Sequence, residues 1–344
     1  MTLFFIDSLF MKKRNKLIID ITKSALFGET VRHPEPISSF QYLQIYKYAK
    51  QNGILAICLD GIQKLPKQLQ PDKPLYMQWT AATASIEERY QTQVKTLEEL
   101  NKTLSPHQIR ILLFKGFSIS RYYPIPKHRE FGDLDVYMFD GFNKSHEILR
   151  KEGIHVHTAN QHHAQFHMND ILIENHEHFL HRGSPRIEKA LEEAAETTRQ
   201  KQTEGILYLP DFENVAYTLL HICGHYKGND CHIRFRALTD WALMLKEEGK
   251  SWHYSDMKKF IKHSYESKMM DLMTLVCCEW FDIVPENLLV KMITVPKKIK
   301  NRFIETVFDK KYQRKDEKNR WKRYWGHLYK HFRYAPLRKY LWKH

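Results

Sequence analysis

The spacing of apolar residues indicates a helical N-terminal region. Up to residue 105 they recur every three or four positions, which places them on one face of a helix. The clearest helix is predicted over Ser85–Leu104, where the apolar positions are Ile86, Tyr90, Val94, Leu97, Leu100 and Leu104. Ser85 and Glu88 match a capping box, so we expect this helix to begin at Ser85.

Between residues 106 and 200 the apolar runs shorten to the length of strands. Ile109–Phe114 is a mostly apolar run and predicts a strand. A second strand carries the sequence Gly132-Asp133-Leu134-Asp135. Gln165–Met168 and Ile171–Phe179 flank a two-residue turn sequence, which predicts a hairpin. These strands alternate with short helical patterns, so a small mixed sheet is expected here.

Helical spacing returns after residue 205, beginning with a helix over Phe212–Tyr226 that Asp211 is placed to cap. We therefore predict an α+β protein in which a small mixed-sheet core is flanked by helical regions. The predicted regions are an N-terminal helical region (1–105), a core (106–200), a C-terminal helical region (205–295) and a basic, aromatic-rich tail (296–344).

The positive charge is concentrated in that tail. The chain has a formal net charge of +14, and residues 296–344 hold 17 Lys and Arg against 4 Asp and Glu. Aromatic residues interleave with the basic ones, as in Trp321-Lys322-Arg323-Tyr324. This pattern fits binding to RNA or another polyanion. It also fits an anionic membrane surface, or a helix that docks its aromatic side chains on the protein itself.

Composition favours a packed protein of the reducing cytoplasm. No apolar run reaches the 18 or more residues of a membrane span. The apolar segment Met1–Phe10 precedes the basic residues Lys12-Lys13-Arg14, which is the reverse of the order in a signal peptide. The five cysteines form no CxxC pair and predict no disulfide framework.

Asp133 and Asp135 predict a metal site. Side chains alternate along a strand, so these two carboxylates face the same way, roughly 6–7 Å apart along the backbone. Glu174 lies in a later strand, which a sheet can bring beside them. Hard carboxylate ligands suit Mg²⁺, which takes its remaining ligands from water and from substrate phosphates. Mn²⁺ is the alternative. The histidine-rich stretch from His155 to His181 fits no zinc spacing and is expected to line the same cleft, with His176 among its residues.

Several short motifs resemble the uncharacterised nucleotidyltransferase family of bacteria, within the polymerase-β-like superfamily. The resemblance spans roughly Leu17–Ile283. Its motifs, in order, are Phe114-Lys115-Gly116, Tyr122-Tyr123-Pro124, Arg129, Gly132-Asp133-Leu134-Asp135, His162-His163, Ile173-Glu174-Asn175-His176, Leu219-Leu220-His221, His225 and Arg236 with Asp240-Trp241.

The resemblance implies that Asp133, Asp135 and Glu174 hold the metal ions, with Glu174 as the carboxylate that acts as, or helps to orient, the base for the attacking hydroxyl. The superfamily holds the triphosphate with a glycine-serine turn. This chain has Lys115-Gly116 instead, with Ser118 two positions on. Lys115 and Arg129 carry the positive charge expected to stabilise a triphosphate.

The predicted function is Mg²⁺-dependent transfer of an NMP from an NTP, such as ATP, to a hydroxyl acceptor. Two alternatives remain at this point. One is a toxin-like version of the same core that modifies tRNA, which the basic tail suits. The other is a non-catalytic protein that keeps the fold to bind nucleotide or nucleic acid.

Overall fold

The computed structural model describes residues 13–31, 37–160, 163–180, 185–228, 233–261, 265–284, 292–308 and 333–342. The chain divides into two compact units. Unit 1 comprises residues 1–80 and 218–344, and unit 2 comprises residues 81–217. Two long helices, α4 (Lys73–Leu104) and α8 (Asp211–Gly228), contribute residues to both units. The four regions predicted from the sequence remain a prediction.

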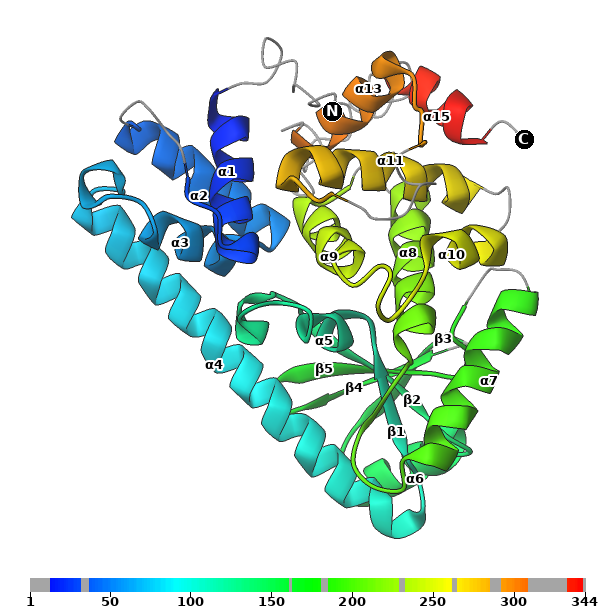
Figure 1. The fold of residues 1–344 in the computed structure, drawn as a ribbon. Coiled ribbons are helices and arrows are strands. Elements are labelled where there is room, and N and C mark those ends of the chain that lie inside the picture. Colours follow the sequence, from blue (N-terminus) through cyan, green and yellow to red (C-terminus); the bar gives the residue numbers. More distant parts are fainter. Residues whose placement is uncertain are drawn as a thin grey trace, which may run out of the picture. The chain divides into compact units, whose positions relative to one another are not determined.

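Unit 2 is built on one six-stranded sheet with the strand order β3-β4-β5-β2-β1-β6 (Figure 1). Its strands are β1 (Ile111–Phe114), β2 (Asp133–Met138), β3 (Val156–Asn160), β4 (His163–Met168), β5 (Ile171–His176) and β6 (Leu207–Tyr208). The β2–β5 and β1–β6 pairs are parallel and the other pairs are antiparallel, so the sheet is mixed. The remaining helices of this unit are α5 (Lys115–Ser120), α6 (Phe142–Lys151) and α7 (Pro185–Lys201).

The two faces of the sheet differ in character. One face carries the apolar positions of the alternation and packs with α4 and α6 into a buried core that includes Leu113, Leu134, Val136, Ile173 and Phe166. Burying these side chains fixes the register, because a slip of one residue would turn the apolar set away from the helices. The opposite face therefore receives the intervening polar residues, which include every predicted carboxylate.

The helix predicted over Ser85–Leu104 begins twelve residues earlier than its capping box indicates. Helix α4 starts at Lys73, where the Asp72 side chain accepts a hydrogen bond from the Leu75 amide at 3.1 Å. Ser85 lies inside the helix, and its hydroxyl donates to the Ala81 carbonyl oxygen. The predicted start was wrong because a serine inside a helix can donate its hydroxyl to a carbonyl oxygen of the preceding turn. Such a serine does not have to mark the start of a helix.

Unit 1 consists mostly of helices (Figure 1). These are α1 (Lys13–Phe27), α2 (Ser39–Asn52), α3 (Leu55–Gln63), α9 (Phe235–Leu245), α10 (Tyr254–Ile261), α11 (Tyr265–Phe281), α13 (Lys297–Phe308) and α15 (Ala335–Trp342). Gly61 allows α3 to lie against α1, because a Cβ at this position would stand 2.0 Å from the Ile21 carbonyl oxygen. Buried aromatic side chains such as Trp241 and Trp280 fill the core.

The observed architecture confirms the predicted α+β class, with one mixed sheet and flanking helices. None of the helices in the described ranges combines the length and the apolar character needed to cross a membrane. The apolar segment Met1–Phe10 and the aromatic residues of the tail around Trp321 lie outside the described residues.

Candidate functional site

A row of side chains crosses the polar face of the sheet on four neighbouring strands. Phe114 of β1 pairs with Asp135 of β2, Asp135 with Glu174 of β5, and Glu174 with Gln165 of β4. Residues that pair across a sheet share a face, so these four side chains project together. The register thus places Asp135 beside Glu174, although 38 residues separate them in the sequence.

Lys115, Asp135 and His176 form a compact network in this row. Lys115 Nζ lies 2.5 Å from Asp135 Oδ1 and 3.4 Å from His176 Nε2, and His176 Nε2 lies 2.9 Å from the same carboxylate oxygen. The side chains of Asp135 and His176 are 4% and 2% exposed, and that of Lys115 is 14% exposed. A charge-assisted contact this short, with so little solvent, holds the carboxylate firmly in place.

The ionisation of these groups follows from their neighbours. Burial works to raise the pKa of Asp135, but the positive charge of Lys115 and the His176 hydrogen bond outweigh it and lower that pKa to about 2. Burial works to lower the pKa of Lys115, but its neighbours Tyr217, Asp135 and Glu174 raise it instead. Both partners are therefore charged at neutral pH.

Asp133 is in the opposite electrostatic situation. Burial and the negative charges of Asp135 and Glu174 all raise its pKa above the ordinary value, and the charge of Lys115 offsets them only in part. The cluster of carboxylates is thus short of positive charge, even with Lys115 in place. A cation at this face would relieve that repulsion.

The donor atoms suit a divalent ion. One ligand atom each from Asp135, Glu174 and His176 lie within 4.8 Å of one another, which brings two carboxylates and an imidazole into reach of a single ion. Asp133 lies outside this group of three, on the same face of β2 as Asp135. Gln165 Nε2 donates to Glu174 Oε1 at 2.6 Å and so orients that carboxylate.

The turn after β1 aims Lys115 at the carboxylates. Lys115 has a φ of +54°, in the left-handed region, so the chain passes directly from the strand into α5. The next residue must be small, because a Cβ on Gly116 would lie 3.0 Å from Phe131 Cβ and 3.3 Å from Arg129 Nη1. The buried Arg129 guanidinium donates to the Gly116 carbonyl oxygen at 2.8 Å and fixes the turn from the other side.

Two other residues singled out in the sequence, Ser118 and His163, lie outside the network of Lys115, Asp135 and His176. Ser118 is fully buried, and its hydroxyl donates to Asn214 Oδ1 of α8 at 3.1 Å, which ties α5 to that helix. His163 stacks on His176, with ring centroids 5.6 Å apart, and so borders the cluster as expected. Burial lowers the pKa of His163. The neighbouring His162 lies outside the described residues.

Two residues of the site carry no signal in the sequence. Gln165 is one polar position in an alternating strand, and only the pairing of β4 with β5 shows that it holds Glu174. Tyr217 lies among apolar residues of α8, so the sequence pattern alone suggests only a residue of the hydrophobic core. It packs edge-on against Phe114 with ring centroids 5.1 Å apart and lies beside Lys115, where burial raises its pKa.

A model of the family described as uncharacterised nucleotidyltransferase matches residues 38–282. The chain belongs to this family. The match contains every residue of the cluster and most of the helices around it, so it supports nucleotidyl transfer as the general activity and a nucleotide as substrate. No curated protein and no solved structure matches the chain significantly.

Proposed function

We propose that this member of the uncharacterised nucleotidyltransferase family is a Mg²⁺-dependent enzyme related to the polymerase-β-like superfamily. It would transfer an NMP from an NTP to a hydroxyl acceptor. The observation that carries the proposal is the aligned pair Asp135 and Glu174 with Asp133 on the same face, where Asp135 forms an ion pair with Lys115. Mn²⁺ would serve in place of Mg²⁺.

In this proposal Asp133, Asp135 and Glu174 hold the metal ions, and His176 orients Asp135. A bound divalent pair would neutralise the phosphates and stabilise the attacking and leaving oxygens. Gln165 fixes the rotamer of Glu174, which accepts or directs the proton of the attacking hydroxyl. Tyr217 and Phe114 form the apolar wall that limits water beside the cluster.

Lys115 has two roles in this proposal. In the free enzyme its ammonium group neutralises Asp135. With the carboxylates holding metal, the Lys115 ammonium would be free to contact a phosphate of the nucleotide. Arg129 acts indirectly, because it is buried and its guanidinium supports the Lys115-Gly116 turn through the Gly116 carbonyl.

A substitution at Asp133 tests the proposal. Thermal melting with each NTP, with and without Mg²⁺ or Mn²⁺, is measured on wild type, on Asp133→Asn and on the control Asp170→Asn. Asp170 is an exposed residue of the β4–β5 turn with a left-handed backbone that asparagine tolerates. Wild type and control are expected to show a metal-dependent rise in Tm with NTP and transfer of label from radiolabelled NTP. Asp133→Asn is expected to lose both.

The metal-free melting temperature separates a site defect from misfolding. A carboxyl whose pKa is raised by folding destabilises the folded state above that pKa, where it must ionise against its surroundings. Asp133→Asn removes this cost and is expected to melt above wild type at neutral pH. An unchanged response to NTP and metal in Asp133→Asn would refute the metal assignment.

A further inference from the structure

A pocket of about 550 Å³ lies within unit 1, away from the carboxylate cluster in the sequence. Its lining comes from three helices, with Lys268 from α11, Lys298 and Ile299 from α13, Pro336, Lys339 and Tyr340 from α15, and Pro296 from the segment before α13. The volume falls in the range of about 300–1,000 Å³ that is typical of ligand pockets.

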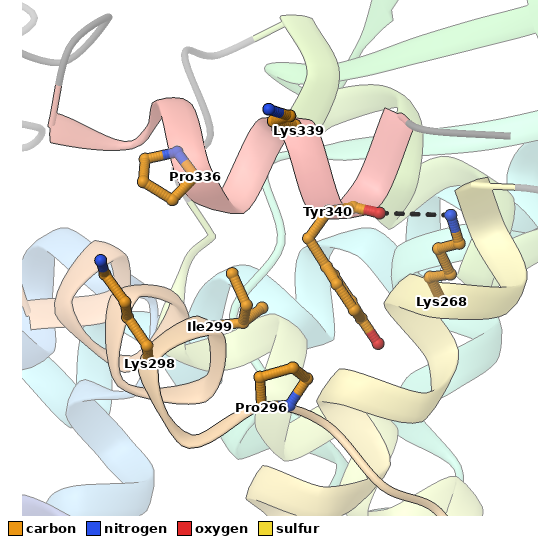
Figure 2. Close-up of a pocket in the computed structure, with 7 residues that line it drawn as sticks. All are labelled: Lys268, Pro296, Lys298, Ile299, Pro336, Lys339 and Tyr340. Carbon is orange, nitrogen blue, oxygen red and sulfur yellow. Dashed lines mark hydrogen bonds between the residues drawn. The ribbon is translucent and has the colours of Figure 1, made fainter.

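The charged residues that line this pocket are all cationic. Three of the seven lining residues are lysines, and none is acidic. Lys268 Nζ donates to the Tyr340 carbonyl oxygen at 3.2 Å, which joins α11 to α15 (Figure 2). Lys298 and Lys339 are exposed and have no acidic partner within the described ranges. Among the described residues, their charges are therefore available to an anion.

The apolar part of the lining lies between these charges. In Figure 2 Ile299 and Tyr340 lie between Lys298 and Lys268. The Tyr340 ring is half-buried, and Pro296 and Pro336 add flat, rigid surface. An aromatic ring bordered by lysines offers stacking and phosphate contacts together, the combination by which proteins hold single-stranded nucleic acid.

We propose that this pocket binds a single-stranded RNA segment, with one base against Tyr340 and adjoining phosphates on Lys298 and Lys339. A polymer fits better than a free mononucleotide, because Lys298 and Lys339 lie on different helices and a strand offers a separate phosphate to each. The part of the sequence that supplies most of the lining, residues 296–344, also carries the chain's charge excess, with 17 Lys and Arg against 4 Asp and Glu. A concave lining with an aromatic ring accommodates a single base better than it accommodates the flat surface of a lipid membrane.

Fluorescence anisotropy of a labelled oligo(U), about twelve nucleotides long and within the ~4–16-nucleotide range of such sites, tests this proposal. The test variant is Lys298→Gln/Lys339→Gln. Its matched control is Lys297→Gln/Arg338→Gln, which removes the same charge from neighbouring positions of α13 and α15 that do not line the pocket. Tyr340→Leu tests stacking and keeps an apolar side chain in the pocket.

We expect the paired lysine variant to reduce the slope of log affinity against log salt by about 1.4, at ~0.7 for each lost phosphate contact with a single strand. The control is expected to reduce it by less than half as much. Tyr340→Leu should weaken binding on the order of tenfold, the loss of one base stack. Asp133→Asn should bind the oligonucleotide as wild type does. The binding test therefore remains interpretable even if the proposed nucleotide-donor site proves wrong.

Three results would overturn the proposal. One is oligonucleotide affinity that falls equally in the lysine variant and its control. Another is a free nucleotide, UMP, that binds as tightly as the oligonucleotide, which would make the pocket a nucleotide site. The third is binding to phosphatidylserine vesicles that Lys298→Gln/Lys339→Gln abolishes while oligo(U) binding persists, which would make it a membrane contact.

Discussion

Replacing Lys115 with methionine removes the positive charge from the buried cluster and keeps the length of the side chain. The Asp135 carboxylate then retains only the His176 contact in surroundings that leave it 4% exposed. If the Lys115 ammonium neutralises Asp135 in the free enzyme, as a metal ion would in the loaded enzyme, the loss of Lys115 should destabilise the metal-free protein. The same loss should make a divalent ion bind more tightly.

The magnitude follows from the pKa of Asp135. A fall in the pKa from 3.8 to about 2 is worth about 2–3 kcal/mol at ~1.4 kcal/mol per pKa unit, and Lys115 is the largest favourable contributor to it. Removing one partner of a buried pair typically costs about 3–5 kcal/mol. Because His176 remains, we expect Lys115→Met to lose about 2–3 kcal/mol of unfolding free energy at neutral pH.

The pH dependence has a definite sign. A carboxyl with a lowered folded pKa stabilises the protein above its unfolded pKa, and this contribution is lost as pH falls through the folded value. The stability gap between wild type and Lys115→Met should therefore be full at neutral pH. It should close as pH falls from about 4 toward 2.

Urea unfolding with and without Mn²⁺, together with calorimetric titration of Mn²⁺, measures both effects. Lys258→Met is the control, because Lys258 Nζ lies 2.7 Å from Asp271 Oδ2 and forms a half-buried pair in unit 1, whereas the cluster belongs to unit 2. We expect Mn²⁺ to bind about tenfold or more tightly to Lys115→Met than to wild type, where each ~1.4 kcal/mol relieved is a factor of ten. The control should leave it unchanged. Equal Mn²⁺ affinity in Lys115→Met and wild type would refute the reasoning.

Two further substitutions test the support of the site. Gly116→Ala places a Cβ 3.0 Å from Phe131 Cβ and 3.3 Å from Arg129 Nη1. It should cost about 1–3 kcal/mol in urea unfolding, and unchanged stability would show that the turn tolerates bulk. Gln165→Leu removes the 2.6 Å hydrogen bond to Glu174. It should weaken Mn²⁺ binding about tenfold in calorimetry with little change in Tm, whereas undiminished affinity would mean that Glu174 is held by other contacts.

The sequence predicted the shared face of the Asp133 and Asp135 carboxylates because alternation within one strand is a local pattern. Alternation along one strand is enough to place Asp133 and Asp135 on the same face, and the structure has them in β2 with Leu134 and Val136 turned into the core. The apolar alternation also predicted β5, and with it the side of the strand that Glu174 occupies. Predictions of this kind need only the two-residue period of a strand.

The sequence was silent where the outcome depends on pairing between distant strands. Nothing local states that Asp135 pairs with Glu174 in parallel, or that Gln165 lies beside Glu174. Ser118 is a related case. A resemblance to glycine-serine turns placed it near the phosphates, but its position one turn into α5 directs it toward Asn214 instead.

The charge balance of the cluster bears on the order of binding. Three carboxylates face one lysine, and burial together with the repulsion from Asp135 and Glu174 raises the pKa of Asp133. An NTP brings more negative charge to the same face, so nucleotide alone meets an unfavourable field. In the proposed enzyme the carboxylates would hold a divalent ion, and Lys115, no longer paired with Asp135, would be available to the phosphates. In the proposed enzyme, metal and nucleotide therefore favour each other's binding, and such coupling is equal in both directions. In this proposal Lys115 stabilises the metal-free site but does not by itself give that site affinity for nucleotide.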